Sequence, residues 1–196
     1  MKIKICGITN VEDALHAVAC GADALGFVFY KESPRYISPT DAKAVIDQLP
    51  PFVERVGLFV KEDRETIECI SRACDISRAQ IHFDMDEVSL EKIRFPTLPV
   101  VRAKSPQDVH LFAERYRLID AYCEAYGGSG KRLNVEWFNG VDCSKIILAG
   151  GLTAENVEEV KKYGFYGVDV SSGVERTKAK KDPAKVKQFI ANAKAF

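Results

Sequence analysis

Five side chains that can exchange a proton or carry a charge lie at the ends of short apolar runs in this sequence. The first run ends in Cys6, and later runs end in or next to His82, Arg102, Asp120 and Asp169. A thiol and a carboxyl group that face each other across a substrate can act as a general base and a general acid. The alternative for Cys6 is a buried structural thiol, and for Asp120 a solvated loop acid.

Neither Cys6 nor Asp120 suits acid–base catalysis at its ordinary pKa. A thiol with a pKa of about 8.5 is only slightly ionised at neutral pH, whereas a carboxyl group with a pKa of about 3.9 is almost fully ionised. Catalysis would require burial to raise the pKa of Asp120, and positive charge or hydrogen bonds to lower that of Cys6. Arg35, in the loop segment "SPRYISP", can bind a carboxylate through two parallel hydrogen bonds; a surface salt bridge is the alternative.

Glycine-rich turns follow the last two apolar runs and favour an anion site. The segments "LAGGL" and "VDVSSGVE" each lie where a strand would pass into a helix. Backbone N–H groups in such turns can approach a phosphate closely, because glycine has no Cβ. The residues expected to bind phosphate in these turns are Gly150, Gly151, Ser171, Ser172 and Gly173. A third segment, "GGSGK", is not a nucleotide-binding P-loop, because Ala125 stands at the first required glycine and Arg132 follows the lysine.

The elements that must position these groups are eight β-rich runs separated by segments with helical apolar spacing. The expected strands are 2–6, 24–29, 53–60, 78–83, 98–103, 115–120, 145–150 and 166–170. Ser38 and Ser105 each precede a proline and an acidic residue, and Asp182 precedes Pro183, as is typical of helix N-termini. Strand–helix units repeated at intervals of roughly 20–30 residues are typical of parallel α/β folds.

An open doubly wound sheet and a closed eight-stranded barrel both fit this alternation. A dinucleotide-binding sheet would carry G-x-G-x-x-G after its first strand, but the first turn here is "CGITN". The glycine-rich turns instead come late in the chain, and barrels commonly build a phosphate site from the loops after strands seven and eight. We therefore predict that residues 1–196 form one compact α/β domain, a (βα)8 TIM barrel, with its active site at the carboxyl ends of the strands.

Composition argues against several classes of function. The 28 basic residues balance the 28 acidic ones, so no global field would draw the protein to nucleic acid or to a membrane surface. The longest apolar run, "ALGFVFY", is far shorter than the roughly 20 residues of a membrane span, and the N-terminus has no secretory pattern. The cysteines lack zinc-type spacing, which indicates free thiols and no metal. We expect a cytoplasmic protein.

Seven segments, taken in order, point to one family. They are "KICGIT", "GADALGFVFY", "SPRYISP", "RVGLFV", "YGGSGK", "LAGGL" and "VDVSSGVE". Together they resemble the phosphoribosylanthranilate isomerase family of tryptophan biosynthesis, over nearly the whole chain. The resemblance implies a small (βα)8 barrel that converts N-(5'-phosphoribosyl)anthranilate into 1-(2-carboxyphenylamino)-1-deoxyribulose 5-phosphate. This Amadori rearrangement needs no metal or organic cofactor.

The resemblance also implies roles for individual residues. Cys6 corresponds to the family's general base, Asp120 to its general acid, and Arg35 to the arginine that holds the anthranilate carboxylate. The loop "GGSG" adds Gly128 and Ser129 to the phosphate site. The substrate would be a small phosphosugar, and the chain would act as a monomer or a homodimer. The further pocket candidates, without an assigned role, are His82, Arg102 and Asp169.

Two departures from the family pattern and three competing interpretations stay open. Phe83 stands at a glycine position of the family and could narrow the pocket, and "RLNVEW" lengthens the loop after "GGSGK". A different phosphate-binding barrel enzyme would use Lys104. A non-catalytic phosphosugar-binding protein would have no need of Cys6 and Asp120. A redox sensor would need a second thiol close to Cys6, for which Cys123 is the candidate.

Overall fold

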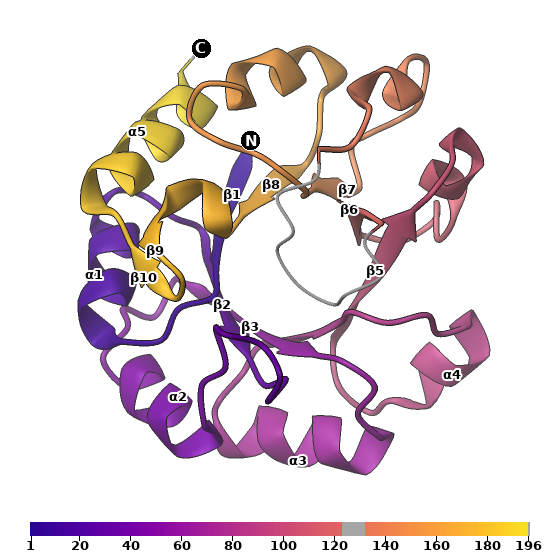
Figure 1. Ribbon diagram of the computed structural model, residues 1–196. Coiled ribbons are helices and arrows are strands. Elements are labelled where there is room, and N and C mark those ends of the chain that lie inside the picture. Colours follow the sequence, from indigo (N-terminus) through magenta and orange to yellow (C-terminus); the bar gives the residue numbers. More distant parts are fainter. Residues whose placement is uncertain (123–131, 196) are drawn as a thin grey trace.

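Eight parallel strands form a closed barrel in the computed structural model, which describes residues 1–122 and 132–195 (Figure 1). The strands are β1 (Lys2–Cys6), β2 (Ala24–Val28), β3 (Glu54–Phe59), β4 (Arg78–Ile81), β5 (Thr97–Ala103), β6 (Arg117–Ala121), β7 (Ile146–Leu148) and β8 (Gly167–Val170). Each strand pairs with the next along the chain, and β8 pairs with β1 to close the ring. The predicted eight-stranded α/β barrel is confirmed, and the open-sheet alternative is wrong.

Helices surround the ring of strands, but they differ between its two halves. The α-helices are α1 (Val11–Ala19), α2 (Pro39–Ile46), α3 (Arg64–Ala73), α4 (Glu87–Lys92) and, at the closure, α5 (Pro183–Lys194). The connections from β5 to β8 instead contain the 3₁₀ helices η1 (Pro106–His110), η2 (Val135–Phe138) and η3 (Val157–Tyr163). A 3₁₀ turn closes through i→i+3 hydrogen bonds and so fits a short connection. The expected order of strands and helices is confirmed, whereas this change of helix type was not predicted.

The predicted helix starts are formed by side-chain caps. Oγ of Ser38 accepts the backbone N–H of Asp41 at 3.1 Å, and Oδ1 of Asp182 accepts that of Ala184 at 2.9 Å. Such caps satisfy N–H groups that have no partner within the first helical turn. Ser105 also forms a capping box, although the helix that it opens is of the 3₁₀ type.

Side chains along each strand alternate between the barrel interior and the layer under the helices, as the period of a strand requires. On β1, Ile3 and Ile5 belong to the main core, whereas Lys4 and Cys6 make their contacts inside the ring. Two small apolar clusters occupy the interior, and they comprise Cys6, Val28, Leu58 and Val60 and, separately, Leu98, Val100, Leu118 and Ala149. The remaining inward positions described below are polar.

A short hairpin follows the last barrel strand and was not predicted. The chain passes from β8 through η4 (Ser172–Val174) into the antiparallel strands β9 (Glu175–Thr177) and β10 (Lys180–Lys181). The backbone N–H of Lys181 donates to Asp13 of α1 at 3.0 Å, and Oγ1 of Thr9 donates to the carbonyl of Ala179 at 2.8 Å. These bonds hold the hairpin against α1 and the segment that leaves β1 (Figure 1).

The two ends of the barrel differ in character. At the end where the strands begin, the amino-end mouth, a cavity of about 560 Å³ is lined by residues that include Lys2, Asp23, Phe52 and Tyr116. The side chain of Phe52 is 98% exposed beside this cavity. The end where the strands finish is called the carboxyl-end mouth. The polar side chains that were singled out in the sequence gather there.

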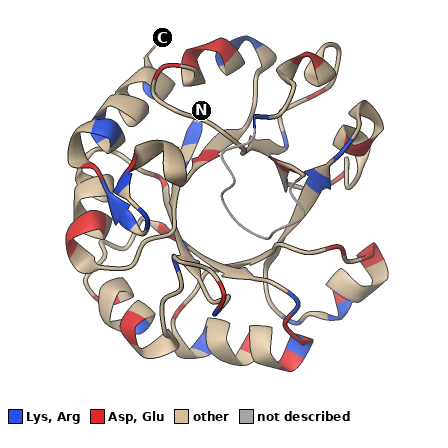
Figure 2. Cartoon of the chain, viewed as in Figure 1, with Lys and Arg blue, Asp and Glu red and all other residues tan. Residues whose placement is uncertain are grey.

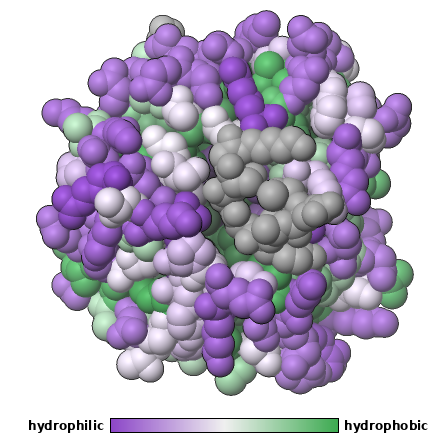
Figure 3. All heavy atoms as spheres, in the orientation of Figure 1, coloured by the Kyte–Doolittle hydropathy of each residue, from purple (hydrophilic) through white to green (hydrophobic). Residues whose placement is uncertain are grey.

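The outer surface carries charges of both signs on its helices and loops (Figure 2). The face in Figure 3 is largely hydrophilic, with apolar residues in small separate areas around the part that the structure does not describe. Among residues 1–122 and 132–195, no helix has the length and apolar character needed to cross a membrane. This mixed surface agrees with the balanced composition of the chain.

Candidate active site

Cys6 ends β1 at the carboxyl-end mouth, and its side chain is buried. Gly7 follows with a φ of +77°, a conformation that favours glycine. A Cβ at position 7 would lie 2.6 Å from Cδ of Arg35 and 3.1 Å from Oγ of Ser171. The glycine therefore turns the chain away directly after the thiol and lets Arg35 and Ser171 pack beside it.

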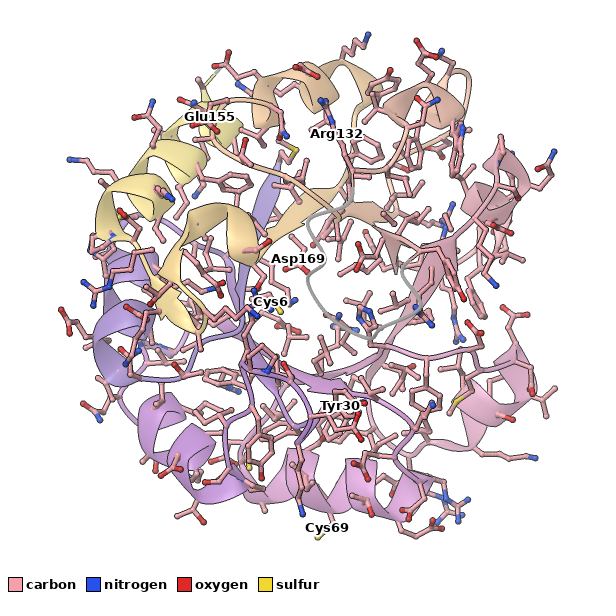
Figure 4. All side chains as sticks on the ribbon, viewed as in Figure 1. Cys6, Tyr30, Cys69, Arg132, Glu155 and Asp169 are labelled. Carbon is pink, nitrogen blue, oxygen red and sulfur yellow. The ribbon has the colours of Figure 1, made fainter. Side chains whose placement is uncertain are left out.

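A buried ion pair lies next to the thiol. Nζ of Lys4 donates to Oδ1 of Asp169 at 2.9 Å, between side chains that are 5% and 10% exposed. A Cβ built on Gly26 of β2 would lie 2.8 Å from Sγ of Cys6 and 3.1 Å from Cε of Lys4, so both side chains lie against the same point of β2. Figure 4 labels Cys6 and Asp169 within the ring, on β1 and β8.

The charges around Cys6 act in opposite directions. The pKa of Cys6 is raised overall, because burial removes the solvation of a thiolate and the carboxylate of Asp169 adds to this effect, while the ammonium groups of Lys4 and Lys181 oppose it. The lowered pKa expected for Cys6 is therefore not found; the cations limit the increase. Burial also disfavours the ammonium group of Lys4, but Asp169 and Cys6 outweigh it, so the pKa of Lys4 is raised. Lys4 is therefore a permanent cation beside the thiol.

Arg35 forms a second buried ion pair at this mouth. Its Nε and Nη2 donate to the two carboxylate oxygens of Glu175 at 2.7 and 2.8 Å, and Nζ of Lys181 donates to the same carboxylate at 3.1 Å. All three side chains are less than a tenth exposed, so the surface salt bridge considered for Arg35 is wrong. A guanidinium group has five N–H donors in a planar fork. The edge formed by Nη1 and the second N–H of Nη2 takes no part in the pair with Glu175.

Asp120 lies near the end of β6 in a different environment. The backbone N–H of Ala121 donates to its Oδ1 at 2.8 Å, and Nε2 of His82 lies 3.8 Å from its Oδ2. Burial and the negative charge of Asp169 raise the pKa of Asp120 to about 6, against the opposing effects of the Ala121 N–H, Lys4 and Arg102. The carboxyl group thus titrates close to neutral pH.

His82 is a neutral imidazole in this environment. Burial, together with the charges of Lys4 and Arg102, lowers the pKa of His82 to about 4. Its Nδ1 lies 3.2 Å from the side-chain nitrogen of Gln80. When this amide donates to Nδ1, the ring proton lies on Nε2, the atom that faces Asp120. Phe83, the next residue, packs against the outer core instead, so it does not narrow the interior.

The two glycine-rich turns predicted to bind phosphate pack against each other. Gly150 and Gly151 have φ values of +87° and +64°. A Cβ on Gly173 would lie 1.9 Å from the carbonyl oxygen of Leu152, a contact that no other residue could make. Oγ of Ser171 is buried without a hydrogen-bond partner among the described residues. These turns therefore form one continuous surface with an unsatisfied hydroxyl group in it.

The structure groups the predicted site residues into two sets. Cys6, Arg35 and Asp169 share one network of contacts and charges, and His82 and Asp120 share another. Arg102 stands next to Asp120 in the register of β5 and β6 and acts on it electrostatically. Gly128, Ser129 and the redox candidate Cys123 lie outside the described residues.

Sequence reasoning missed three buried charged residues of this site. Lys4 had a signal, because it stands two positions before Cys6 in "KIKIC" and so faces the same side of the strand. Glu175 is the last residue of the segment "VDVSSGVE", but nothing in the sequence pairs it with Arg35. Lys181 had no comparable signal, because it belongs to the hairpin beyond the last barrel strand. Among residues 1–122 and 132–195, no cluster of His, Cys, Asp and Glu has a geometry that could hold a metal ion.

A closed parallel barrel whose ionisable side chains and glycine turns gather at the carboxyl ends of its strands defines a (βα)8-barrel enzyme. The family model described as N-(5'phosphoribosyl)anthranilate (PRA) isomerase matches residues 3–192. The chain belongs to this family. It is an isomerase of tryptophan biosynthesis.

Known proteins support this membership over the full length. An N-(5'-phosphoribosyl)anthranilate isomerase of Sulfurovum sp. is 73% identical over 196 residues, which cover 100% of both chains. The crystal structure of phosphoribosyl anthranilate isomerase from Thermotoga maritima has a TM-score of 0.92 at 40% identity, covering 99% of this chain and 98% of that one. Another solved structure of such an isomerase, in complex with reduced 1-(o-carboxyphenylamino)-1-deoxyribulose 5-phosphate, has a TM-score of 0.87 at 37% identity and covers 99% and 98% of the two chains.

Proposed function

We propose that Cys6 is the general base and Asp120 the general acid of the isomerisation. The observation that carries this assignment is the pKa of Asp120, which burial and the neighbouring Asp169 raise to about 6. At Cys6, where the pKa is also raised, the cations Lys4 and Lys181 oppose the effect of burial. A carboxyl group with a pKa of about 6 keeps a proton in a useful fraction of molecules near neutral pH. Asp120 can therefore donate a proton where an ordinary aspartate could not.

The reaction begins at the furanose ring oxygen of N-(5'-phosphoribosyl)anthranilate. Asp120 gives its proton to this oxygen, the bond from the oxygen to C1' breaks, and the substrate nitrogen becomes the positively charged end of a Schiff base. The thiolate of Cys6 then removes the proton from C2', and the electron pair moves into the iminium group to give an enolamine. Loss of the O2' proton and protonation at C1' give the ketone of 1-(2-carboxyphenylamino)-1-deoxyribulose 5-phosphate.

Protons and electrons balance in this scheme without a metal or an organic cofactor. The substrate receives one proton from Asp120 and gives one to Cys6, and the two groups return to their starting states by exchange with water. The substrate nitrogen accepts the electron pair that would otherwise need an external electron sink. We therefore propose cofactor-free catalysis.

The remaining site residues hold the two ends of the substrate. The edge of Arg35 that Glu175 leaves open presents two parallel N–H groups, which suit the anthranilate carboxylate. The phosphate would lie on the turns after β7 and β8, where the unsatisfied hydroxyl group of Ser171 supports an anion site. The proposed phosphate-binding residues are Gly128, Ser129, Gly150, Gly151, Ser171, Ser172 and Gly173. His82, Arg102 and Asp169 line the interior between the two ends.

The proposal extends to the organisation and surroundings of the protein. We take residues 1–196 as one domain that acts in the cytoplasm on a small phosphosugar and binds no nucleic acid. The cysteines Cys6, Cys20, Cys69, Cys74 and Cys143 are all free thiols, as in a reducing compartment.

Of the two oligomeric states considered, monomer and homodimer, the exposed Phe52 beside an open cavity favours the homodimer. One solved relative is described as monomers of a dimeric Thermotoga maritima isomerase. Sedimentation at several protein concentrations distinguishes the two states.

The acid–base assignment is tested by turnover of freshly prepared phosphoribosylanthranilate, followed through the loss of its fluorescence. Cys6→Ser and Asp120→Asn should each lower kcat by about 10²-fold or more. Matched controls are Cys69→Ser and Asp142→Asn, which change an exposed thiol and an exposed carboxylate far from the mouth and should leave kcat unchanged. Full activity of either site variant would remove that residue from its proposed role.

A further inference from the structure

The interior of the barrel contains a buried lysine that the acid–base scheme does not use. Lys4 lies inside the ring at 4% exposure, with its ammonium group bound to Asp169. A buried charge costs several kcal/mol of solvation, and replacing a buried ion pair with apolar residues is often neutral or stabilising. Stability alone therefore gives no reason for this pair inside the barrel.

The position of Lys4 suggests a reason. Cys6 follows it by two residues on β1, so the two side chains project from the same face of the strand. Sγ of Cys6 and Cε of Lys4 each lie within about 3 Å of the point where a Cβ of Gly26 would stand. The ammonium group is thus held by Asp169 at short range from the sulfur, where a unit charge of opposite sign strongly favours the anion.

We propose that Lys4 is a positioning residue for the reaction: clamped by Asp169, its ammonium group stabilises the Cys6 thiolate and thereby keeps the general base available. This inference rests on the proposed function only for its catalytic consequence. The stabilisation of the thiolate itself is a property of the free protein and can be measured without turnover.

The other charges that face Cys6 do not replace Lys4. Lys181 on β10 acts on the thiol in the same direction, and Arg35 interacts with it from the loop after β2. Burial lowers the pKa of Lys181, whereas the pKa of Lys4 is raised, and Lys181 and Arg35 share one carboxylate, that of Glu175. Asp169 on β8 is the anion of the group and opposes the thiolate. Lys4 is therefore the cation on the thiol's own strand, with Asp169 as its counter-ion.

The two members of the pair have opposite effects on Cys6, which gives a two-sided test. Lys4→Met keeps an unbranched side chain that is one atom shorter and removes its charge, whereas Asp169→Asn keeps the shape and removes the anion. The rate of alkylation of Cys6 by iodoacetamide is measured against pH by mass spectrometry of the peptide that contains it. Cys20 lies in the same tryptic peptide and serves as the internal control.

We expect Lys4→Met to move the midpoint of the Cys6 alkylation profile upward by about one pH unit or more, and Asp169→Asn to move it downward. The Cys20 profile should not move in either variant. In turnover, Lys4→Met should lose about tenfold in kcat at pH 7 and recover as the pH rises, with little change in KM. Lys4→Arg should restore part of the loss.

Several outcomes would overturn the inference. An unchanged Cys6 profile in folded Lys4→Met would make the lysine merely structural, as would shifts in the same direction in both variants. If Lys4→Met does not fold, a downward shift in Asp169→Asn supports the electrostatic account and an unchanged or upward shift refutes it. Failure of the proposed function would give a different result. An active Cys6→Ser enzyme would show that Cys6 is not the general base, while the alkylation shifts in Lys4→Met and Asp169→Asn would still be observed.

Discussion

The two sides of the catalytic interior place their ionisable groups among different neighbours. The base side, defined as Cys6 with Lys4, Arg35, Glu175 and Lys181, surrounds a thiol with cations. The acid side, defined as Asp120 with His82 and Gln80, places a carboxyl group beside a neutral imidazole. Asp169 lies between the two sides and acts on both.

The comparison shows how one cavity can serve two different acid–base needs. Burial raises the pKa of Asp120 and the pKa of Cys6 alike, since it disfavours both anions. This effect helps a general acid and hinders a general base. Cations oppose the effect of burial at both groups: Lys4 acts on both, Lys181 on Cys6, and Arg102 on Asp120. Because both groups are buried, the difference between them is set by the neighbours of each group.

The largest expected effect is on kcat, and it distinguishes Asp120 from the neighbouring His82. Asp120→Asn should lower kcat by about 10³-fold, whereas His82→Asn should lower it by about tenfold or less, because a neutral imidazole donates no charge to the transition state. Steady-state kinetics at pH 7 measure both. Equal losses would show that His82 shares the proton transfer and that the acid side is a dyad.

The next effect concerns the stability of the base side. Glu175→Gln leaves the buried cations Arg35 and Lys181 without their anion, so the free energy of unfolding should fall by about 3 kcal/mol or more. The matched control is Glu159→Gln, which breaks an exposed pair with Arg132 and should cost less than about 1 kcal/mol. Urea unfolding at pH 7 compares the two. A small loss at position 175 would mean that the cations repel each other little.

The acid side should show two opposing pH dependences of stability. Folding raises the pKa of Asp120 from 3.8 to about 6, so its contribution is present at low pH and lost as the pH rises through about 6. Folding lowers the pKa of His82 from 6.5 to about 4, so its contribution is present above 6.5 and lost as the pH falls through about 4. Each amounts to about 3 kcal/mol, and in the wild type they offset each other.

Single substitutions should uncover these dependences. Asp120→Asn should gain stability as the pH rises from about 4 to 6.5, because only the effect of His82 remains. His82→Asn should lose stability over the same rise in pH, because only the effect of Asp120 remains. Urea unfolding at several pH values gives the slopes. Slopes of the same sign in the two variants would contradict the opposite pKa shifts.

The smallest expected effect disturbs the base side alone. Gly26→Ala adds a Cβ that would stand 2.8 Å from the Cys6 sulfur, which has to move aside. The Cβ would also lie 3.1 Å from the backbone Cα of Cys6, which cannot move aside as a side chain can, so stability should fall by about 1–3 kcal/mol. The value of kcat should fall by about tenfold because the thiol is displaced. The pH dependence due to Asp120 should stay the same. A shift of that dependence would show that the two sides are mechanically coupled.

Much of this site could be predicted from the sequence because a parallel barrel imposes simple geometry. Cys6, His82, Arg102, Asp120 and Asp169 all stand at or near strand ends on inward positions, and those two conditions are visible in the sequence. The turns at Gly150 and Gly173 could be predicted because glycine lets a backbone approach an anion or another backbone closely. Local rules suffice for these features.

The rest depended on contacts between distant parts of the chain. The partner of Arg35 is Glu175, which lies 140 residues away in a hairpin that no strand or turn rule anticipates. The 3₁₀ helices after β5, β6 and β7 result from short connections around the ring, and apolar periodicity does not distinguish them from α-helices. Lys4 was missed because the alternating pattern of this strand was interpreted from its apolar residues and not from its inward lysine.

The closure of the barrel by β1 and β8 has a consequence for synthesis of the chain. The Lys4–Asp169 bond joins residues 165 positions apart, and the bidentate bond of Arg35 to Glu175 joins residues 140 apart. During translation Cys6 and Lys4 emerge first, and their counter-charges emerge only near the end. These two ion pairs at the catalytic end of the barrel can therefore form only after residues 169 and 175 have been synthesised, close to the end of translation.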